Sequence, residues 1–130
     1  MQPDHKLALR AHGFFLLTLP QNLETFDMFT FHSDTQAPKN HTCGTAACSL
    51  GWTPTSLNLP NRAPAWYDLA EELFGIVEDT SVWYFLFDTD HPNDPHAAGR
   101  RCLFVADHPD NNNPTQDEAD KHYNRNYKFA

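Results

Sequence analysis

The sequence predicts an all-α protein, a single compact domain of four to six short helices joined by long, proline-bearing loops. Apolar residues recur at helical spacing in several segments, and no pair of segments alternates as strands do. The chain has 130 residues, of which 40% are apolar, and this is enough for one hydrophobic core. Ten prolines against five glycines indicate rigid connections between the helices.

The first helix is expected over residues 5–19. Asp4 is a suitable N-cap, and Pro20 ends the segment. The aromatic segment 23–31 that follows is expected to cover the core as a turn or short helix, and residues 33–40 as a surface loop. The apolar stripe of the first helix is expected to consist of Leu7, Ala11, Phe14, Phe15 and Thr18.

A dense run of small residues follows, and we call residues 41–52 the cysteine cassette. It reads His-Thr-Cys-Gly-Thr-Ala-Ala-Cys-Ser-Leu-Gly-Trp. Residues 45–52 are expected to form a short helix, since their small side chains would let a neighbouring helix approach closely. Residues 54–64 contain three prolines and are expected to form a loop.

The clearest helix begins near Pro64, which suits a first helical turn, and stops at Gly75. A second helix is expected over residues 82–87, with Asp79 or Ser81 as its N-cap. The apolar face of the clearest helix recurs at i, i+3, i+4, i+7 and i+8, and consists of Trp66, Leu69, Ala70, Leu73 and Phe74.

The last long helix is expected over residues 96–106, after Asp94 and Pro95. Its inward residues are expected to be Ala98, Cys102 and Val105, and its outward residues Arg100 and Arg101.

The remaining segment, residues 107–130, is expected to be a loop and a tail that packs back on the body. The loop covers residues 107–113, and a short helix covers residues 116–122. The aromatic residues that would hold the tail to the body are Tyr123, Tyr127 and Phe129.

Charge is distributed unevenly along this acidic chain. The formal net charge is −8, from nine Lys and Arg against seventeen Asp and Glu. Residues 63–99 contain no Lys or Arg, and they hold eight acidic residues: Asp68, Glu71, Glu72, Glu78, Asp79, Asp88, Asp90 and Asp94. Such a segment serves either solubility or the recognition of a basic partner. Direct nucleic-acid binding is disfavoured, because few cations are present to displace counterions.

Residues 83–87 add a row of aromatic side chains to this acidic segment. Trp83, Tyr84, Phe85 and Phe87 cannot all be buried on one side of a short helix. The helix is therefore either sandwiched in the core, or it exposes an aromatic patch beside acidic residues. The second arrangement predicts a protein-binding surface, since Trp and Tyr anchor many interfaces.

The order of motifs resembles a family of small bacterial and bacteriophage proteins with no established activity. Its pattern Cys-Gly-Thr-x-x-Cys-x-x-Gly-Trp stands here at residues 43–52. The resemblance covers residues 23–92, and it implies a helical fold and a phage or mobile-element setting, but no reaction. This chain departs from the pattern at Phe31, where tryptophan is common. The other matching residues are Phe26, Asp27, Met28, Ala70, Leu73, Leu86, Phe87 and Pro92.

The cysteine cassette allows three interpretations. His41, Cys43 and Cys48 form a His-x-Cys-x4-Cys array, but zinc needs four ligands and no second cysteine pair exists. Alternatively, Cys48 could act as a nucleophile with His41 or His32 as its base. The favoured interpretation is that both cysteines are small buried hydrophobic residues.

These observations together predict a non-enzymatic, acidic protein-binding module of phage or mobile-element origin, without catalytic residues or a cofactor. Its partner would be a host protein with a basic surface. The most specific form of this prediction is an inhibitor of a host nucleic-acid-binding defence complex, such as an anti-CRISPR protein. The alternatives are a zinc or thiol enzyme centred on the cassette and a structural phage component. The predicted partner-binding residues are Asp68, Glu71, Glu72, Glu78, Asp79, Trp83, Tyr84, Asp88 and Asp90.

A cytoplasmic location and no membrane partner are expected. The first residues lack the basic-then-apolar order of a signal peptide. The longest apolar run is far too short to span a bilayer. Three cysteines, an odd number, also argue against a secreted disulfide framework.

Overall fold

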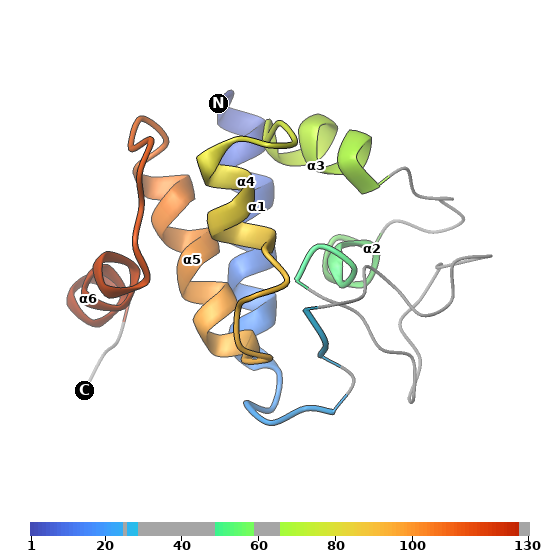
Figure 1. Ribbon diagram of the computed structural model, residues 1–130, viewed down its shortest axis with the longest axis vertical. Helices are drawn as coiled ribbons and strands as arrows, with labels where there is room; N and C mark the ends of the chain where they lie inside the picture. Colours follow the sequence, from blue (N-terminus) through green and yellow to red (C-terminus); the bar gives the residue numbers. More distant parts are fainter. Residues whose placement is uncertain (25, 29–48, 59–65, 128–130) are drawn as a thin grey trace.

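A computed structural model of the chain describes residues 1–24, 26–28, 49–58 and 66–127. This part of the chain contains six α-helices and no β-strand, and the helices pack around one hydrophobic core (Figure 1). The predicted all-α fold is therefore confirmed. The helices are α1 (Pro3–Thr18), α2 (Thr53–Ser56), α3 (Trp66–Phe74), α4 (Ser81–Phe87), α5 (Pro95–Asp107) and α6 (Gln116–Asn126).

Helices α1 and α5 form the central pair, and the other helices pack on it (Figure 1). Helices α4 and α6 contact α5, whereas α2 and α3 contact α1. The central pair is in backbone contact at two glycines: a Cβ atom on Gly99 would lie 2.7 Å from the carbonyl oxygen of Gly13. No side chain fits between the helices there, so the two glycines determine how closely α1 and α5 approach each other.

The buried face of α1 agrees with the predicted stripe only at Phe15, which is half-buried and packs against the core, and the prediction is wrong for the other four residues. Leu7 is 62% exposed and Phe14 is 43% exposed, and Ala11 and Thr18 are exposed as well. The helix is turned so that Gly13 meets α5, and close backbone packing therefore outweighs the exposure of two large apolar side chains. The residues that face inward are Leu9, His12, Gly13 and Leu16.

The start of α1 also differs from the prediction. Its N-cap is Gln2, and Asp4 lies in the first turn, because Pro3 occupies the start of the helix. An acidic residue in that turn still stabilises the helix through the helix dipole.

The described part of the cysteine cassette is not helical, contrary to the prediction for residues 45–52. Residues 49–52 form turns, and Leu50 and Trp52 are buried. The short helix α2 follows instead, inside the segment predicted as a loop, with Pro54 in its first turn, where the missing N–H costs nothing. Residues 45–48 and 59–64 lie outside the described residues.

The segment before the cassette covers the core as expected. Phe26 and Met28 are each 1% exposed, and turns occur at Glu24 and Met28. Phe31 and the rest of this segment lie outside the described residues.

Helices α3 and α4 lie close to their predicted positions. Helix α3 ends before Gly75, whose φ of 67° is the left-handed conformation that favours glycine. The N-cap of α4 is Thr80, not Asp79 or Ser81, and the Thr80 hydroxyl accepts the backbone N–H of Trp83 at 3.2 Å. Asp79 has a left-handed φ of 66° in the preceding turn, which leaves Thr80 at the capping position.

Helix α5 begins as predicted but has a buried arginine. The carboxylate of Asp94 caps it by accepting the backbone N–H groups of His96 and Ala97. Ala98, Cys102 and Val105 face inward as expected.

Arg101 is fully buried, so its predicted outward position is wrong. Helix α6 covers this side of α5, and the Arg101 guanidinium donates to the Gln116 side-chain oxygen at 2.9 Å. Burial lowers the pKa of Arg101 to about 10. A pattern along α5 alone cannot show that another helix covers this face.

The C-terminal segment packs on the body through α6, which is longer than predicted. Ala119 is fully buried in the α5–α6 contact. The Tyr127 hydroxyl, just after α6, donates to the Asp107 carboxylate, and the Arg100 guanidinium lies 5.0 Å from the centre of the Tyr123 ring. Phe129 lies outside the described residues. No helix in the described ranges is long and apolar enough to cross a membrane.

Candidate functional site

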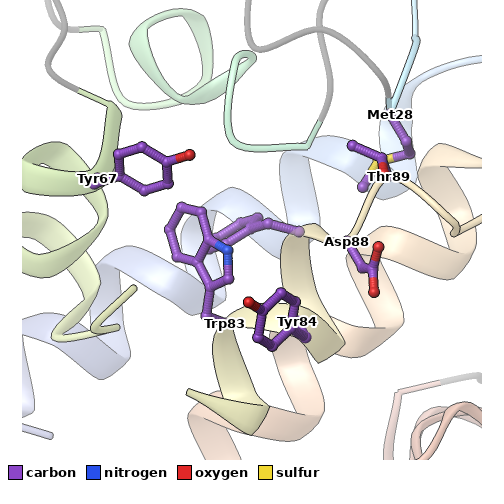
Figure 2. A pocket seen from close by; sticks show the side chains of 7 residues that line it. Met28, Tyr67, Trp83, Tyr84, Asp88 and Thr89 are labelled. Atoms are coloured by element: carbon purple, nitrogen blue, oxygen red, sulfur yellow. The ribbon is translucent and has the colours of Figure 1, made fainter. Parts of the chain in front are cut away.

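An open pocket of about 260 Å³ lies between α3 and α4, within the acidic segment of the sequence (Figure 2). One wall comes from α3 and the opposite wall from α4 and the turn that follows it. Met28, from the segment after α1, closes one end. The lining residues are Met28, Tyr67, Trp83, Tyr84, Phe87, Asp88 and Thr89.

Aromatic rings form the walls of this pocket. The ring centres of Tyr67 and Trp83 lie 5.1 Å apart, and Figure 2 shows the Tyr67 ring facing the indole. Phe87 also contacts the indole, with 4.9 Å between ring centres. Trp83 is only 6% exposed, whereas Tyr67 and Tyr84 are 44% and 47% exposed. Two tyrosines therefore present their surfaces to solvent on either side of a buried tryptophan.

Carboxylates surround the exposed tyrosine of α4. The Tyr84 hydroxyl donates to Asp79 Oδ1 at 2.7 Å. This hydrogen bond and the charge of Asp79 raise the pKa of Tyr84, and the charges of Asp88 and Glu78 raise it further. The rim of the pocket therefore carries negative charge next to an aromatic hydroxyl group.

The predicted partner-binding residues divide into two groups in the structure. Asp79, Trp83, Tyr84 and Asp88 lie together at the pocket, with Glu78 nearby. The second group lies outside the pocket lining and is exposed to solvent: Asp68, Glu71, Glu72 and Asp90. Glu71 follows Tyr67 by one turn of α3 and therefore shares its face.

The prediction of an exposed aromatic patch on α4 is only partly right. Trp83, Phe85 and Phe87 are buried, because α4 is packed into the core on most of its circumference, and Tyr84 alone is exposed. Trp83 therefore forms a wall of the pocket, and most of its surface cannot contact a partner. Tyr67 is an exposed aromatic residue that the sequence analysis did not identify, although its spacing of four from Glu71 places it on the acidic face.

Basic side chains are confined to three of the described helices, which also carry acidic residues. Within the described ranges, every Lys and Arg belongs to α1, α5 or α6, and none belongs to α3, α4 or their connections. No described residue of α3 packs against α6. The pocket therefore lies on a side of the molecule where the charged residues that the structure describes on α3, α4 and their connections are all acidic.

The metal and thiol alternatives depend on residues outside the described ranges, namely His32, His41, Cys43 and Cys48. Cys102, the cysteine that the structure describes, is fully buried, and burial raises the pKa of its thiol to about 12. It is therefore protonated near neutral pH and unsuited to bind metal or act as a nucleophile. Among the described side chains, no three from His, Cys, Asp and Glu are grouped to hold a metal ion.

A second cluster, which the sequence analysis missed, lies where α5, α6 and α1 meet. The Asp107 carboxylate accepts hydrogen bonds from Arg10 at 2.5 Å, from His122 Nε2 at 2.8 Å and from the Tyr127 hydroxyl. Burial tends to raise the pKa of Asp107, but the three hydrogen bonds outweigh this effect and hold the pKa below its ordinary value. The partners come from remote segments, so no local pattern could have identified the cluster.

Comparison with known proteins adds no relative, since no family model, curated protein or solved structure matches this chain. The resemblance to the bacterial and bacteriophage family therefore stays a prediction.

Proposed function

We propose that this protein is a non-enzymatic binding module whose acidic side, centred on the pocket between α3 and α4, binds a protein with a basic surface. The observation that carries the proposal is the position of Tyr84, which is 47% exposed and hydrogen-bonded to Asp79 at the rim of the pocket. Amphipathic tyrosines between carboxylates suit a Lys- or Arg-rich partner, which can pair with the acids and stack on the rings.

The shape of the pocket also favours a macromolecular partner. Its volume of about 260 Å³ is at the lower limit for sites that enclose a small molecule. A side chain such as arginine, delivered from another protein, is smaller and fits between Tyr67 and Tyr84. The acidic residues outside the pocket would then form a charged rim around that central contact.

We further propose that the partner is a protein that binds nucleic acids. Proteins that bind nucleic acids present extended basic surfaces, and an acidic side without Lys or Arg in its described helices could compete with the phosphates for such a surface. Together with the resemblance to phage proteins, this suggests an inhibitor of a nucleic-acid-guided defence complex, an anti-CRISPR-like protein acting inside the host cell. The charge and the exposed side chains of the acidic side support this proposal, and it is tested by measuring binding to a basic partner.

Charge reversal at the acidic side is the direct test. We expect a variant with Glu71, Glu72 and Asp90 replaced by lysine to lose at least tenfold in partner affinity, because each reversal turns an attraction into a repulsion. All three side chains are exposed, so the fold should be retained. The measurement is affinity capture from host lysate with mass spectrometry, followed by binding to the purified captured protein at two salt concentrations.

The matched control reverses three exposed acids elsewhere, Glu24, Asp110 and Asp117, so that both variants carry the same net charge. Wild type and control should retain the same basic protein, with an affinity that falls as salt rises. Equal loss in both variants would mean that net charge alone matters, and unchanged binding in the first variant would contradict the proposal.

The anti-CRISPR version has a separate test. Purified protein is added to a nucleic-acid-guided interference complex, and target DNA binding is measured by gel shift. We expect inhibition by wild type and by the control, and none by the first variant. Binding of a basic protein without inhibition of any such complex would contradict this version and leave the general proposal standing.

A further inference from the structure

Two histidines, which lie outside the acidic segment, face each other at the edge of the α5–α6 contact. His108 Nε2 and His122 Nδ1 lie 3.4 Å apart, and their rings are nearly perpendicular, with centres 4.8 Å apart. Both line an open pocket of about 310 Å³, which we call the histidine pocket. His108 is exposed, whereas the His122 side chain is 13% exposed. The other lining residues are Phe104, Asn111, Glu118, Lys121 and Arg125.

The distance between the two ring nitrogens suits a shared metal ion. Imidazole nitrogens bind zinc at about 2.0–2.1 Å, so two of them on a tetrahedral ion stand roughly 3.3–3.4 Å apart. As a direct N–H···N hydrogen bond, a separation of 3.4 Å is long.

The other ring nitrogen of His122, Nε2, contacts a carboxylate, as the second nitrogen of a metal-binding histidine often does. His122 Nε2 lies 2.8 Å from Asp107 Oδ2, and the carboxylate is itself held by Arg10 and Tyr127. A metal-binding histidine usually donates its other N–H to a carboxylate, which fixes the tautomer and the ring orientation. Here the Asp107 contact places the proton on Nε2 and leaves the lone pair of Nδ1 directed toward His108.

Among the residues that the structure describes, an exposed amide competes for that lone pair. The Asn126 side-chain nitrogen lies 3.0 Å from His122 Nδ1, and it also donates to the His122 carbonyl oxygen at 3.0 Å. Asn126 is exposed, so its side chain can rotate away at little cost and keep water as a partner. His108 Nε2 becomes a ligand when the proton of that ring is on Nδ1.

We propose that His108 Nε2 and His122 Nδ1 bind one divalent transition-metal ion, with Asp107 as the residue that orients His122. Two imidazole ligands select Cu²⁺, Ni²⁺ or Zn²⁺ over Mg²⁺ and Ca²⁺, which prefer oxygen. No third His, Cys, Asp or Glu in the described ranges completes the set, so water or an external ligand fills the remaining positions. Lys121 and Arg125 on the pocket wall weaken cation binding, but they favour an anionic external ligand on the metal.

The test is calorimetric titration of the full chain with Cu²⁺, Ni²⁺ and Zn²⁺ near neutral pH. The chain carries Cys43→Ser and Cys48→Ser in all variants, so that the cysteine cassette contributes no thiolate ligands. We expect one ion per chain, with Cu²⁺ bound most tightly. His108→Gln should lower the affinity at least tenfold, and since His108 is exposed, this variant should fold normally. His5→Gln, on α1 and remote from the histidine pocket, is the matched control and should bind as the parent does.

Two further measurements separate metal binding from a structural effect. Excess metal should raise the melting temperature of the parent and of His5→Gln, but not that of His108→Gln. Asp107→Asn should weaken metal binding about tenfold or more, as loss of an orienting carboxylate does elsewhere. Equal metal affinity in the parent and His108→Gln, or no binding by the parent, would overturn the proposal.

Discussion

Replacement of Gly99 by valine is expected to lower the free energy of unfolding by about 3 kcal/mol or more, the largest loss we expect from a single apolar substitution. A Cβ atom at this position would lie 2.7 Å from the Gly13 carbonyl oxygen and 2.9 Å from Leu17 Cγ. The first obstacle is backbone, which cannot rotate away as a side chain can. Helices α1 and α5 must therefore separate, and every helix that packs on them is affected.

The measurement is urea or thermal unfolding followed by circular dichroism, in which a loss of this size lowers the melting temperature by roughly 10 °C. Ala97→Val is the matched control, because Ala97 lies on the same helix and is only partly buried. It should cost less than about 1 kcal/mol, chiefly through the lower helix propensity of valine. Equal stability of Gly99→Val and the control would contradict the close backbone contact.

Acidification is expected to destabilise the protein through His12, which is fully buried on α1. His12 Nε2 lies 2.6 Å from the Ser49 carbonyl oxygen, and Nδ1 lies 2.6 Å from Ser56 Oγ. The neutral ring fits this arrangement when Nε2–H donates to Ser49 and Nδ1 accepts from the Ser56 hydroxyl. Burial lowers the pKa of His12 from 6.5 to about 4, since a charged ring would lose its hydration.

The direction of the effect follows from proton binding. Between about pH 6.5 and pH 4 the unfolded chain binds a proton at this residue and the folded chain does not, so stability falls as the pH falls. At about 1.4 kcal/mol per pH unit, His12 alone removes about 3 kcal/mol between neutral pH and pH 4. Above pH 6.5 this contribution no longer changes with pH.

The measurement is the free energy of unfolding in urea at several values across this pH range. His12→Gln should be less stable than wild type at neutral pH, by about 1–2 kcal/mol, because one of the buried hydrogen bonds is lost. It should also show a smaller loss on acidification. His5→Gln, on the same helix but partly exposed, should keep the wild-type dependence on pH. A wild-type dependence in His12→Gln would show that other groups cause the acid sensitivity.

Much of the helical fold could be predicted from local patterns. The apolar spacing of α3, the Gly75 stop and the Asp94 cap are signals within one or two turns of helix. The structure confirms the stop and the cap, and it buries Leu69, Ala70 and Phe74 of the predicted α3 face. The face of α1 was not predictable in this way, because the choice depends on how closely Gly13 approaches a helix about ninety residues later. Arg101 was placed outward for the same reason, since only α6 makes that side of α5 an interior.

The segment of the sequence that contains the candidate site could be predicted, but the side chains that it exposes could not. The absence of Lys and Arg around α3 and α4 is visible in the sequence, and the exposed acids lie where they were expected. Which aromatic ring remains exposed depends on tertiary packing, and it is Tyr84 together with Tyr67, not Trp83. The Asp107 cluster joins α1, α5 and the residue after α6, so its chemistry appears only when the chain is folded.

The uneven distribution of Lys and Arg among the described helices affects how the molecule orients toward a charged surface. Residues 66–94 carry acids and no Lys or Arg, whereas all described basic residues stand on α1, α5 and α6, so the protein carries an electric dipole in addition to its net charge. In the field of a cationic surface it rotates so that Tyr84 and the acidic residues around it lead. Under the proposed function, encounters with a basic partner would begin in an orientation close to the bound one, and this preference would weaken once the Debye length falls below the size of the protein.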